Sequence, residues 1–266
     1  MVVRKKSFGQ HFLHDRKVMH DTARALEWRE GEKVVEIGPG TGRLTRVLID
    51  HIPLAAITAI ELDREMIEHL AEEMPDLTVL SGDAARMDWG AVVGEGPAVL
   101  VGNLPYNASA PILFNALAHR HRFRRFVFMF QRELALRLAA KPGGGNYGAP
   151  SAIVRLLAPV RYLFTVRPSA FRPPPKVDSA VLAFDPLPTP ALGVAEAEVQ
   201  PLSKFIHGAF QQRRKTLRNN LRAMALDTEP ILAAAGLEGR ERPEELDLEA
   251  FVALWRASLL SPAVTG

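Results

Sequence analysis

Six short runs of β-forming residues recur along the first two-thirds of the chain, and segments compatible with helices separate most of them. The runs cover residues 33–37, 56–61, 77–80, 98–102, 125–130 and 160–166. Strands separated by helix-length segments are typical of parallel pairing, because the chain must cross a sheet face before it starts the next parallel strand. The pattern therefore predicts an α/β protein with a mainly parallel sheet and helices on both faces.

Two further features divide the chain. Residues 15–27 repeat apolar side chains at helical spacing, with Asp15 placed as an N-cap, and residues 179–184 have the composition of a last strand. Four prolines and a glycine follow within 186–201, and from Leu202 onward only helical spacing remains. We expect a domain over 1–185, a linker over 186–201 and a small all-helical domain over 202–266.

The composition excludes some functions. A chain of 266 residues that is 47% hydrophobic can bury a sizeable core, and it has no cysteine for disulfides, thiolate metal sites or a thiol nucleophile. The histidines show no metal-binding spacing, so no metal is expected. No stretch is suited to span a bilayer, and no apolar run follows the positive residues at the N-terminus. We expect a soluble, cytoplasmic protein without a membrane partner.

A glycine-rich turn, EIGPGTG at 36–42, follows the first predicted strand of the sheet. Glycines let the backbone approach a ligand closely, but the GxGxG spacing differs from the GxGxxG of dinucleotide-binding turns. Glu61 ends the second strand about 20 residues later, where an acid can accept both hydroxyls of an adenosine ribose. Asp83 ends the third strand, where it can bind an adenine amino group.

Three acids at successive strand ends would repel a phosphate-bearing ligand, because Glu36, Glu61 and Asp83 all carry negative charge. The combination favours a sulfonium cofactor, S-adenosylmethionine. The alternative is that the glycine turn is only a tight connection between a strand and a helix.

The fourth predicted strand ends in Asn103-Leu104-Pro105-Tyr106. An exocyclic adenine amine is a poor nucleophile, because its lone pair is delocalised into the ring. The side-chain oxygen of Asn103 and the backbone carbonyl of Leu104 can each accept one amine hydrogen and favour a tetrahedral, reactive amine. Pro105 stiffens the turn, and Tyr106 offers a flat face to a flipped-out base. The alternative is an ordinary turn with a capping Asn and a packed Tyr.

Five motifs in order give the chain a resemblance to the small-subunit ribosomal RNA adenine N6,N6-dimethyltransferase family. They are Phe8–Leu13, Glu36–Gly42, Asn103–Tyr106, Phe171–Ser179 and Phe210–Lys215. The resemblance implies a Rossmann-like class I methyltransferase sheet and a catalytic domain that binds S-adenosyl-L-methionine. It also implies dimethylation of two adjacent adenines in a hairpin loop near the 3′ end of 16S ribosomal RNA. The enzyme would act as a monomer on a pre-30S particle during ribosome assembly.

The resemblance also implies roles for single residues. Catalysis would depend on Asn103, Leu104, Pro105, Tyr106 and Phe171, with Phe171 stacked on the target base opposite Tyr106; the alternative is a core Phe. The cofactor would be bound by Gln10, His11, Leu13, Gly38, Gly40, Glu61, Leu62, Asp83, Ala84 and Asn103. His11 stands where many relatives have Asn, although both side chains can donate a hydrogen bond. Ala149-Pro150 stands where an Arg-Leu pair is expected.

Residues 204–222 form a basic run that contains no acid. The net charge of the chain is only +3, so attraction to nucleic acid must come from such local clusters. The run has helical spacing, and cations without counter-charges on a helix can track phosphates. The candidates for RNA binding are Arg213, Arg214, Lys215, Arg218 and Arg222; the alternative is a solvated face.

Other functions compete with this interpretation. An erythromycin-resistance type methyltransferase modifies a 23S ribosomal RNA adenine by similar chemistry, but the proline-rich 173–179 and the Gln-Arg-Arg-Lys motif favour the small-subunit family. DNA adenine and protein glutamine methyltransferases more often carry Asn-Pro-Pro-Tyr, so Leu104 counts against both. A ribosome-assembly or nucleic-acid-binding factor with little turnover is a different class. The intact Gly38, Glu61, Asp83 and Asn103 favour retained catalysis over that class.

Overall fold

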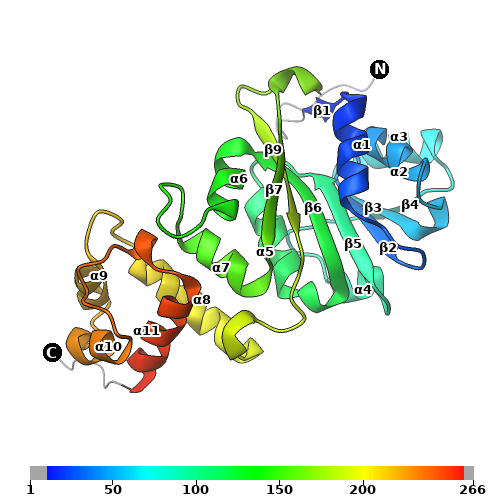
Figure 1. Cartoon of the computed structure of the whole chain (residues 1–266). Helices are drawn as coiled ribbons and strands as arrows, with labels where there is room; N and C mark the ends of the chain where they lie inside the picture. Colours follow the sequence, from blue (N-terminus) through cyan, green and yellow to red (C-terminus); the bar gives the residue numbers. More distant parts are fainter. Residues whose placement is uncertain (1–10, 261–266) are drawn as a thin grey trace. The chain divides into compact units, whose positions relative to one another are not determined.

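The computed structural model describes residues 11–260, which group into two compact units (Figure 1). The first unit contains residues up to Ala135 together with Val160–Pro186. Its seven-stranded sheet has the order β4-β3-β2-β5-β6-β9-β7. The strands are β2 (Lys33–Ile37), β3 (Ile57–Glu61), β4 (Thr78–Ser81), β5 (Ala98–Asn103), β6 (Phe123–Gln131), β7 (Val160–Val166) and β9 (Ser179–Phe184). Each predicted strand lies within two residues of an observed one.

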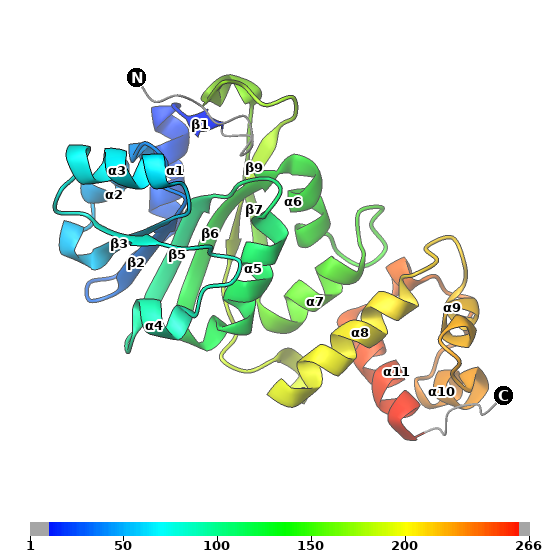
Figure 2. The ribbon, with the colours of Figure 1, turned by 180° about the vertical axis from the view of Figure 1, so that it is seen from behind.

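The strand directions confirm the expected, mainly parallel sheet. Strands β4, β3, β2, β5 and β6 pair in parallel, whereas β9 lies between β6 and β7 and is antiparallel to both. Helix α1 crosses one face of the sheet in Figure 1, and α5 lies on the other face in Figure 2. The helices of this unit are α1 (Arg16–Ala25), α2 (Arg43–Ile49), α3 (Arg64–Glu73), α4 (Trp89–Val93) and α5 (Ser109–Ala118).

Aspartate N-caps fix where three of these helices begin. The Asp15 side chain accepts a hydrogen bond from the backbone amide of Val18, as the sequence pattern predicted. Asp63 and Asp88 cap α3 and α4 in the same way. A side-chain acceptor at this position satisfies one of the free amides of the first turn and is worth about 1 kcal/mol.

The core consists of the two apolar faces of the sheet. On one face, alternate strand residues such as Val34, Val99 and Val127 join Leu26 and Leu48 in a single buried cluster. On β6 the ring of Phe126 stacks on that of Phe128, and both rings contact Phe184. A fully buried Val, Leu or Phe side chain contributes roughly 1.5–3 kcal/mol, so the central strands hold the sheet together.

Close contact between β2 and β5 requires a glycine. A Cβ atom on Gly102 would lie 2.6 Å from the backbone oxygen of Ile37, too close for any other residue without a backbone shift. Gly102 pairs with Ile37 in the parallel register, one residue before Asn103. The glycine therefore lets the last residue of β5 emerge beside the turn that follows β2.

The second unit contains Leu136–Pro159 and Leu187–Gly266. Its helices are α7 (Ala149–Leu157), α8 (Val199–Ala209), α9 (Leu217–Ala223), α10 (Thr228–Ala234) and α11 (Leu248–Leu260), preceded by α6 (Arg132–Ala139), which begins in the first unit. The sequence pattern placed residues 136–159 in the first domain, whereas here they group with the C-terminal helices. One reason is that the rings of Tyr147, Phe210 and Phe251 form one aromatic cluster. Among residues 11–260, no helix is long and apolar enough to span a membrane.

Candidate active site

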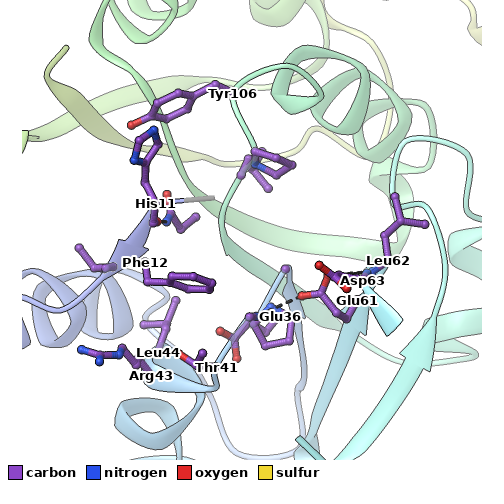
Figure 3. Close-up of a pocket in the computed structure, with 17 residues that line it drawn as sticks. His11, Phe12, Glu36, Thr41, Arg43, Leu44, Glu61, Leu62, Asp63 and Tyr106 are labelled. Carbon is purple, nitrogen blue, oxygen red and sulfur yellow. Dashed lines mark hydrogen bonds between the residues drawn. The ribbon is translucent and has the colours of Figure 1, made fainter. Parts of the chain in front are cut away.

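A pocket opens where β2, β3 and β5 end, and the short strand β1 (Phe12–Leu13) forms another of its walls (Figure 3). β1 is held in place by antiparallel pairing with β8 (Phe171–Arg172). The pocket brings together segments that are far apart in the sequence. Ten expected site residues line it: His11, Leu13, Gly38, Gly40, Glu61, Leu62, Asn103, Leu104, Pro105 and Tyr106.

The glycine turn after β2 brings its backbone close to β1. Gly38 and Gly40 have φ angles of 67° and 54°, in the left-handed region that favours glycine. A Cβ atom on Gly40 would lie 3.0 Å from the ring of Phe12. The pocket wall therefore depends on both the conformation and the missing side chain of Gly40.

The Glu61 carboxylate fixes the shape of this part of the pocket. One oxygen accepts hydrogen bonds from the backbone amides of Leu62 (2.9 Å) and Asp63 (3.0 Å), and the other accepts from Gly40 (3.1 Å). Burial raises the pKa of the Glu61 carboxyl, and these backbone hydrogen bonds oppose the shift. Glu61 therefore connects the end of β3 to the glycine turn, and it also lines the pocket.

Glu36 is a pocket residue that was not among the predicted site residues, although its charge was noted. Its side chain is buried and accepts a hydrogen bond from the Thr45 hydroxyl at 2.6 Å. Burial raises the pKa of the Glu36 carboxyl to about 7; the Thr45 bond lowers it, and the charge of Glu61 raises it further. The position of Glu36 just before the glycine turn could have marked it as a site residue. The spacing of the motif alone did not show that its side chain lines the pocket.

We expect a pH-dependent loss of stability from Glu36. Its folded pKa lies above its ordinary value of 4.5, so the stabilisation it gives is complete below pH 4.5 and is lost as the pH rises through about 7. Between about pH 5 and 8 the wild type should lose on the order of 2–3 kcal/mol more unfolding free energy than Glu36→Gln. Urea denaturation of both proteins across that range measures the difference. Parallel stability curves would contradict it.

Asn103 is oriented by His11, the residue that precedes β1. Its side-chain nitrogen donates to the backbone oxygen of His11 at 3.3 Å. Because a carbonyl oxygen only accepts, the amide nitrogen must face His11, and the Asn103 oxygen points elsewhere. That oxygen has no hydrogen-bond partner within residues 11–260, which leaves an acceptor at the pocket wall.

Tyr106 and His11 lie against each other at the mouth of the pocket (Figure 3). Their ring centroids are 5.8 Å apart, with the planes tilted by 32°. The Tyr106 hydroxyl shares a hydrogen bond of 2.8 Å with Ser179, and burial raises the pKa of Tyr106, which keeps that hydroxyl neutral. The His11 ring nitrogen Nδ1 lies 2.8 Å from the carbonyl oxygen of Pro173, so Nδ1 is the protonated nitrogen. β1 is thereby linked to the proline-rich loop.

Three of the expected residues that the structure describes do not line the pocket. Phe171 is 2% exposed and belongs to the same core cluster as Leu13, so its ring offers no free face to a base. This burial matches the alternative of a core Phe, and the stacking role stays a prediction. Asp83 and Ala84 do not line the pocket; Asp83 instead accepts from the backbone amide of Ala85 at 2.9 Å. Gln10 lies outside the described residues.

The residues that line the pocket suit a ligand that combines an adenosine with a positive charge. Glu36, Glu61 and Asp63 border it and favour a cation over a phosphate. Leu62 is 56% exposed and offers an apolar surface to a flat ring. The Thr41 hydroxyl oxygen is buried at the pocket and has no hydrogen-bond partner within the described part of the chain, so it is available to a ligand. The residues present therefore fit S-adenosylmethionine.

The sheet order and this pocket together define a class I methyltransferase that uses S-adenosylmethionine. The profile of the ribosomal RNA adenine dimethylase family matches residues 2–240, and the chain belongs to that family. A ribosomal RNA small subunit methyltransferase A from Laribacter hongkongensis is 43% identical, with 94% of each chain covered. Its counterpart from Pseudomonas aeruginosa is 42% identical, over 94% of this chain and 92% of the relative.

Solved structures agree in fold. A dimethyladenosine transferase from Plasmodium falciparum has a TM-score of 0.75 and 25% identity, over 92% of this chain and 96% of its own. The 23S rRNA methyltransferase ErmE has a TM-score of 0.71 and 24% identity, over 93% of this chain and 99% of its own, which shows the fold alone. The family confirms that the chain is an enzyme that dimethylates ribosomal RNA adenine.

Proposed function

We propose that this enzyme dimethylates N6 of two adjacent adenines in a hairpin loop near the 3′ end of 16S ribosomal RNA. It acts as a monomer in the cytoplasm, on a pre-30S particle during ribosome assembly. The small subunit is chosen because the chain is 43% identical, over 94% of its length, to a ribosomal RNA small subunit methyltransferase. The likeness to the large-subunit enzyme ErmE, at 24%, extends to the fold only.

Different pocket residues bind different parts of the methyl donor. When bound, S-adenosylmethionine supplies an electrophilic methyl group. Glu61 keeps the glycine turn in place through Gly40 and presents its carboxylate to the ribose hydroxyls. Leu62 packs on the adenine ring, and the acids along the pocket stabilise positive charge. Asp83 and Ala84 are proposed to contact the edge of the adenine ring. Because they do not line the pocket, the adenine must extend past the pocket to reach them.

The turn after β5 prepares the target amine. The free oxygen of Asn103 and the backbone oxygen of Leu104 accept the two amine hydrogens, which favours the charge that develops on nitrogen during transfer. The Leu104 side chain is buried, so it anchors the turn in the protein core. Because His11 fixes the Asn103 amide before any substrate arrives, little reorganisation is needed at the reacting nitrogen.

Tyr106 contributes its ring more than its hydroxyl. Tyr106→Phe keeps the stacking face and loses only the bond to Ser179, so single-turnover methyl transfer should stay close to the parental rate. Tyr106→Ala loses about 1–3 kcal/mol of base stacking and should reduce transfer about 10- to 100-fold. Ser179→Ala removes the same hydrogen bond from the other side and should behave like Tyr106→Phe. Equal losses in Tyr106→Phe and Tyr106→Ala would assign the role to the hydroxyl instead.

A competition between substrates tests the choice of subunit. The enzyme is supplied with equal amounts of small and large ribosomal subunits from strains that lack the respective adenine methylations, and labelled methyl groups are mapped on each RNA. We expect label on two adjacent adenines of the small-subunit RNA only. Label on the large-subunit RNA would support the erythromycin-resistance type of activity, and binding without label would support an assembly factor.

A further inference from the structure

The basic run in the second unit is not one helix. α8 ends at Ala209 and α9 begins at Leu217, so the expected continuous helical stretch is wrong. The run also has a counter-charge, because Glu229 on α10 pairs with Arg218 and lies 3.5 Å from Arg222. Its role in RNA binding stays a prediction. A more sharply defined arrangement lies in the first unit, in the turn after β4.

This turn, residues 82–87 and here named the β4 turn, carries the two residues proposed to contact the edge of the adenine ring. They are Asp83 and Ala84, and Ala84 is buried. The backbone amide of Gly82 donates to the backbone oxygen of Glu61 at 3.0 Å. The β4 turn therefore begins beside the residue proposed to bind the ribose of the same cofactor.

The side chain of Asn115 connects α5 to the β4 turn. Its nitrogen donates to the backbone oxygens of Ala84 and Met87, both at 3.0 Å. Because a carbonyl oxygen only accepts, the nitrogen of the Asn115 amide must face the turn. One side chain thus holds the turn at two points, from a helix that lies 28 residues or more further along the chain.

One peptide group connects Asn115 to the carboxylate of Asp83. The peptide between Ala84 and Ala85 accepts from Asn115 through its oxygen, and its N–H donates to Oδ1 of Asp83 at 2.9 Å. A peptide group is planar, so fixing its oxygen also fixes the direction of its N–H. That N–H in turn orients the Asp83 carboxylate.

Two polar groups of the β4 turn remain available to a ligand. Oδ2 of Asp83 makes no hydrogen bond within residues 11–260, and Nε of Arg86, on a side chain that is 89% exposed, lies 3.9 Å from it. The backbone amide of Ala84 has no hydrogen-bond partner among the same residues. An acceptor next to a donor complements the N6 amine and N1 of adenine. Hypoxanthine presents the reverse pattern, with an oxygen at position 6 and a hydrogen on N1.

We propose that Asn115 is a positioning residue that sets the base specificity of the cofactor site. It holds the β4 turn so that Oδ2 of Asp83 and the amide of Ala84 are aligned for adenine before the cofactor binds. This rests on the proposed function, which assigns those two residues to the adenine edge. A site aligned in advance rejects the reversed pattern strongly, because donor would face donor and acceptor would face acceptor.

Two cofactor products that differ only in the base test this role. S-adenosylhomocysteine carries adenine, and S-inosylhomocysteine carries hypoxanthine. Competition of each against labelled S-adenosylmethionine on the full-length protein gives two dissociation constants. Asn115→Ala should weaken S-adenosylhomocysteine about tenfold and leave S-inosylhomocysteine nearly unchanged, so the preference for adenine falls about tenfold. Equal weakening of both ligands is the result of merely structural damage and would overturn the proposal, as would a parental preference.

Thr22→Val is the matched control. It removes another buried hydrogen bond from a side chain to a backbone oxygen, from Thr22 to Val18 at 2.8 Å. This bond lies in α1, on the face of the sheet opposite α5 (Figure 1 and Figure 2). Both dissociation constants should stay at their parental values. Asn115→Leu, which removes both donors at similar volume, provides a second variant should Asn115→Ala not fold, and the same fall in adenine preference is expected.

Asp83→Asn distinguishes failure of this inference from failure of the proposed function. The Asn oxygen can still accept from Ala85, so its nitrogen takes the place of Oδ2 and faces the adenine amine donor to donor. The preference for adenine should therefore fall. An unchanged preference would contradict the adenine role in the proposed function, and with it this inference. A lower preference in Asp83→Asn with a parental one in folded Asn115→Ala would overturn the positioning role alone.

Discussion

Replacing Asn103 by alanine should slow methyl transfer by on the order of 100-fold or more, while the affinity for RNA stays near the parental value. The side-chain oxygen of Asn103 is the acceptor at the end of β5 that no described residue uses, and its orientation is fixed by the bond from the amide nitrogen to His11. The lost interaction strengthens as the amine becomes tetrahedral, so its removal lowers the rate more than binding.

Single-turnover transfer at saturating RNA measures this effect, with folding and cofactor affinity checked separately. Asn107→Ala is the matched control, because it makes the same substitution four residues later at an exposed side chain. It should transfer methyl groups at the parental rate. Transfer by Asn103→Ala at that same rate would show that the turn has no part in activating the amine.

Replacing Glu61 by alanine should weaken S-adenosylmethionine binding about 10- to 100-fold, equivalent to about 1–3 kcal/mol. The variant loses the carboxylate proposed to bind the ribose, and it leaves the amides of Gly40, Leu62 and Asp63 without their acceptor. Glu61→Gln should not restore binding. Both Glu61 oxygens accept from backbone amides, so the glutamine nitrogen would face a donor.

Calorimetric titration with S-adenosylmethionine tests both Glu61 variants. Glu68→Ala serves as the control, since it removes an exposed acid that pairs with Arg64 on α3. Its affinity should match the wild type. Unchanged affinity in a folded Glu61→Ala protein would remove Glu61 from the cofactor site.

The central strands could be predicted closely because nearly all of their residues are buried. Continuous apolar runs such as Ser179–Phe184 mark a central strand but carry no information about its direction. The insertion of β9 between β6 and β7, antiparallel to both, therefore could not be read from the pattern. The grouping of α7 with the C-terminal helices depends on contacts between distant segments, which local spacing does not encode.

The part of the pocket that is formed by the ends of the parallel strands could be predicted from the sequence. Glu61 and Asn103 follow parallel strands, and parallel strands end at one edge of a sheet. The wall formed by β1 came only from the resemblance, because residues 8–13 have no periodicity that would place them. The burial of Phe171 and the approach of Glu229 to the basic run are tertiary effects, and neither residue is marked by its neighbours in sequence.

The most direct test of the central claim is nucleoside analysis of undermethylated small subunits after incubation with S-adenosylmethionine and either wild-type or Asn103→Ala enzyme. With wild type, we predict N6,N6-dimethyladenosine at two adjacent positions of the small-subunit RNA. With Asn103→Ala, that product should be reduced by on the order of 100-fold at equal particle binding. Absence of the dimethylated nucleoside with folded wild-type enzyme, or equal yields from the two proteins, would contradict an amine-activating site at the end of β5.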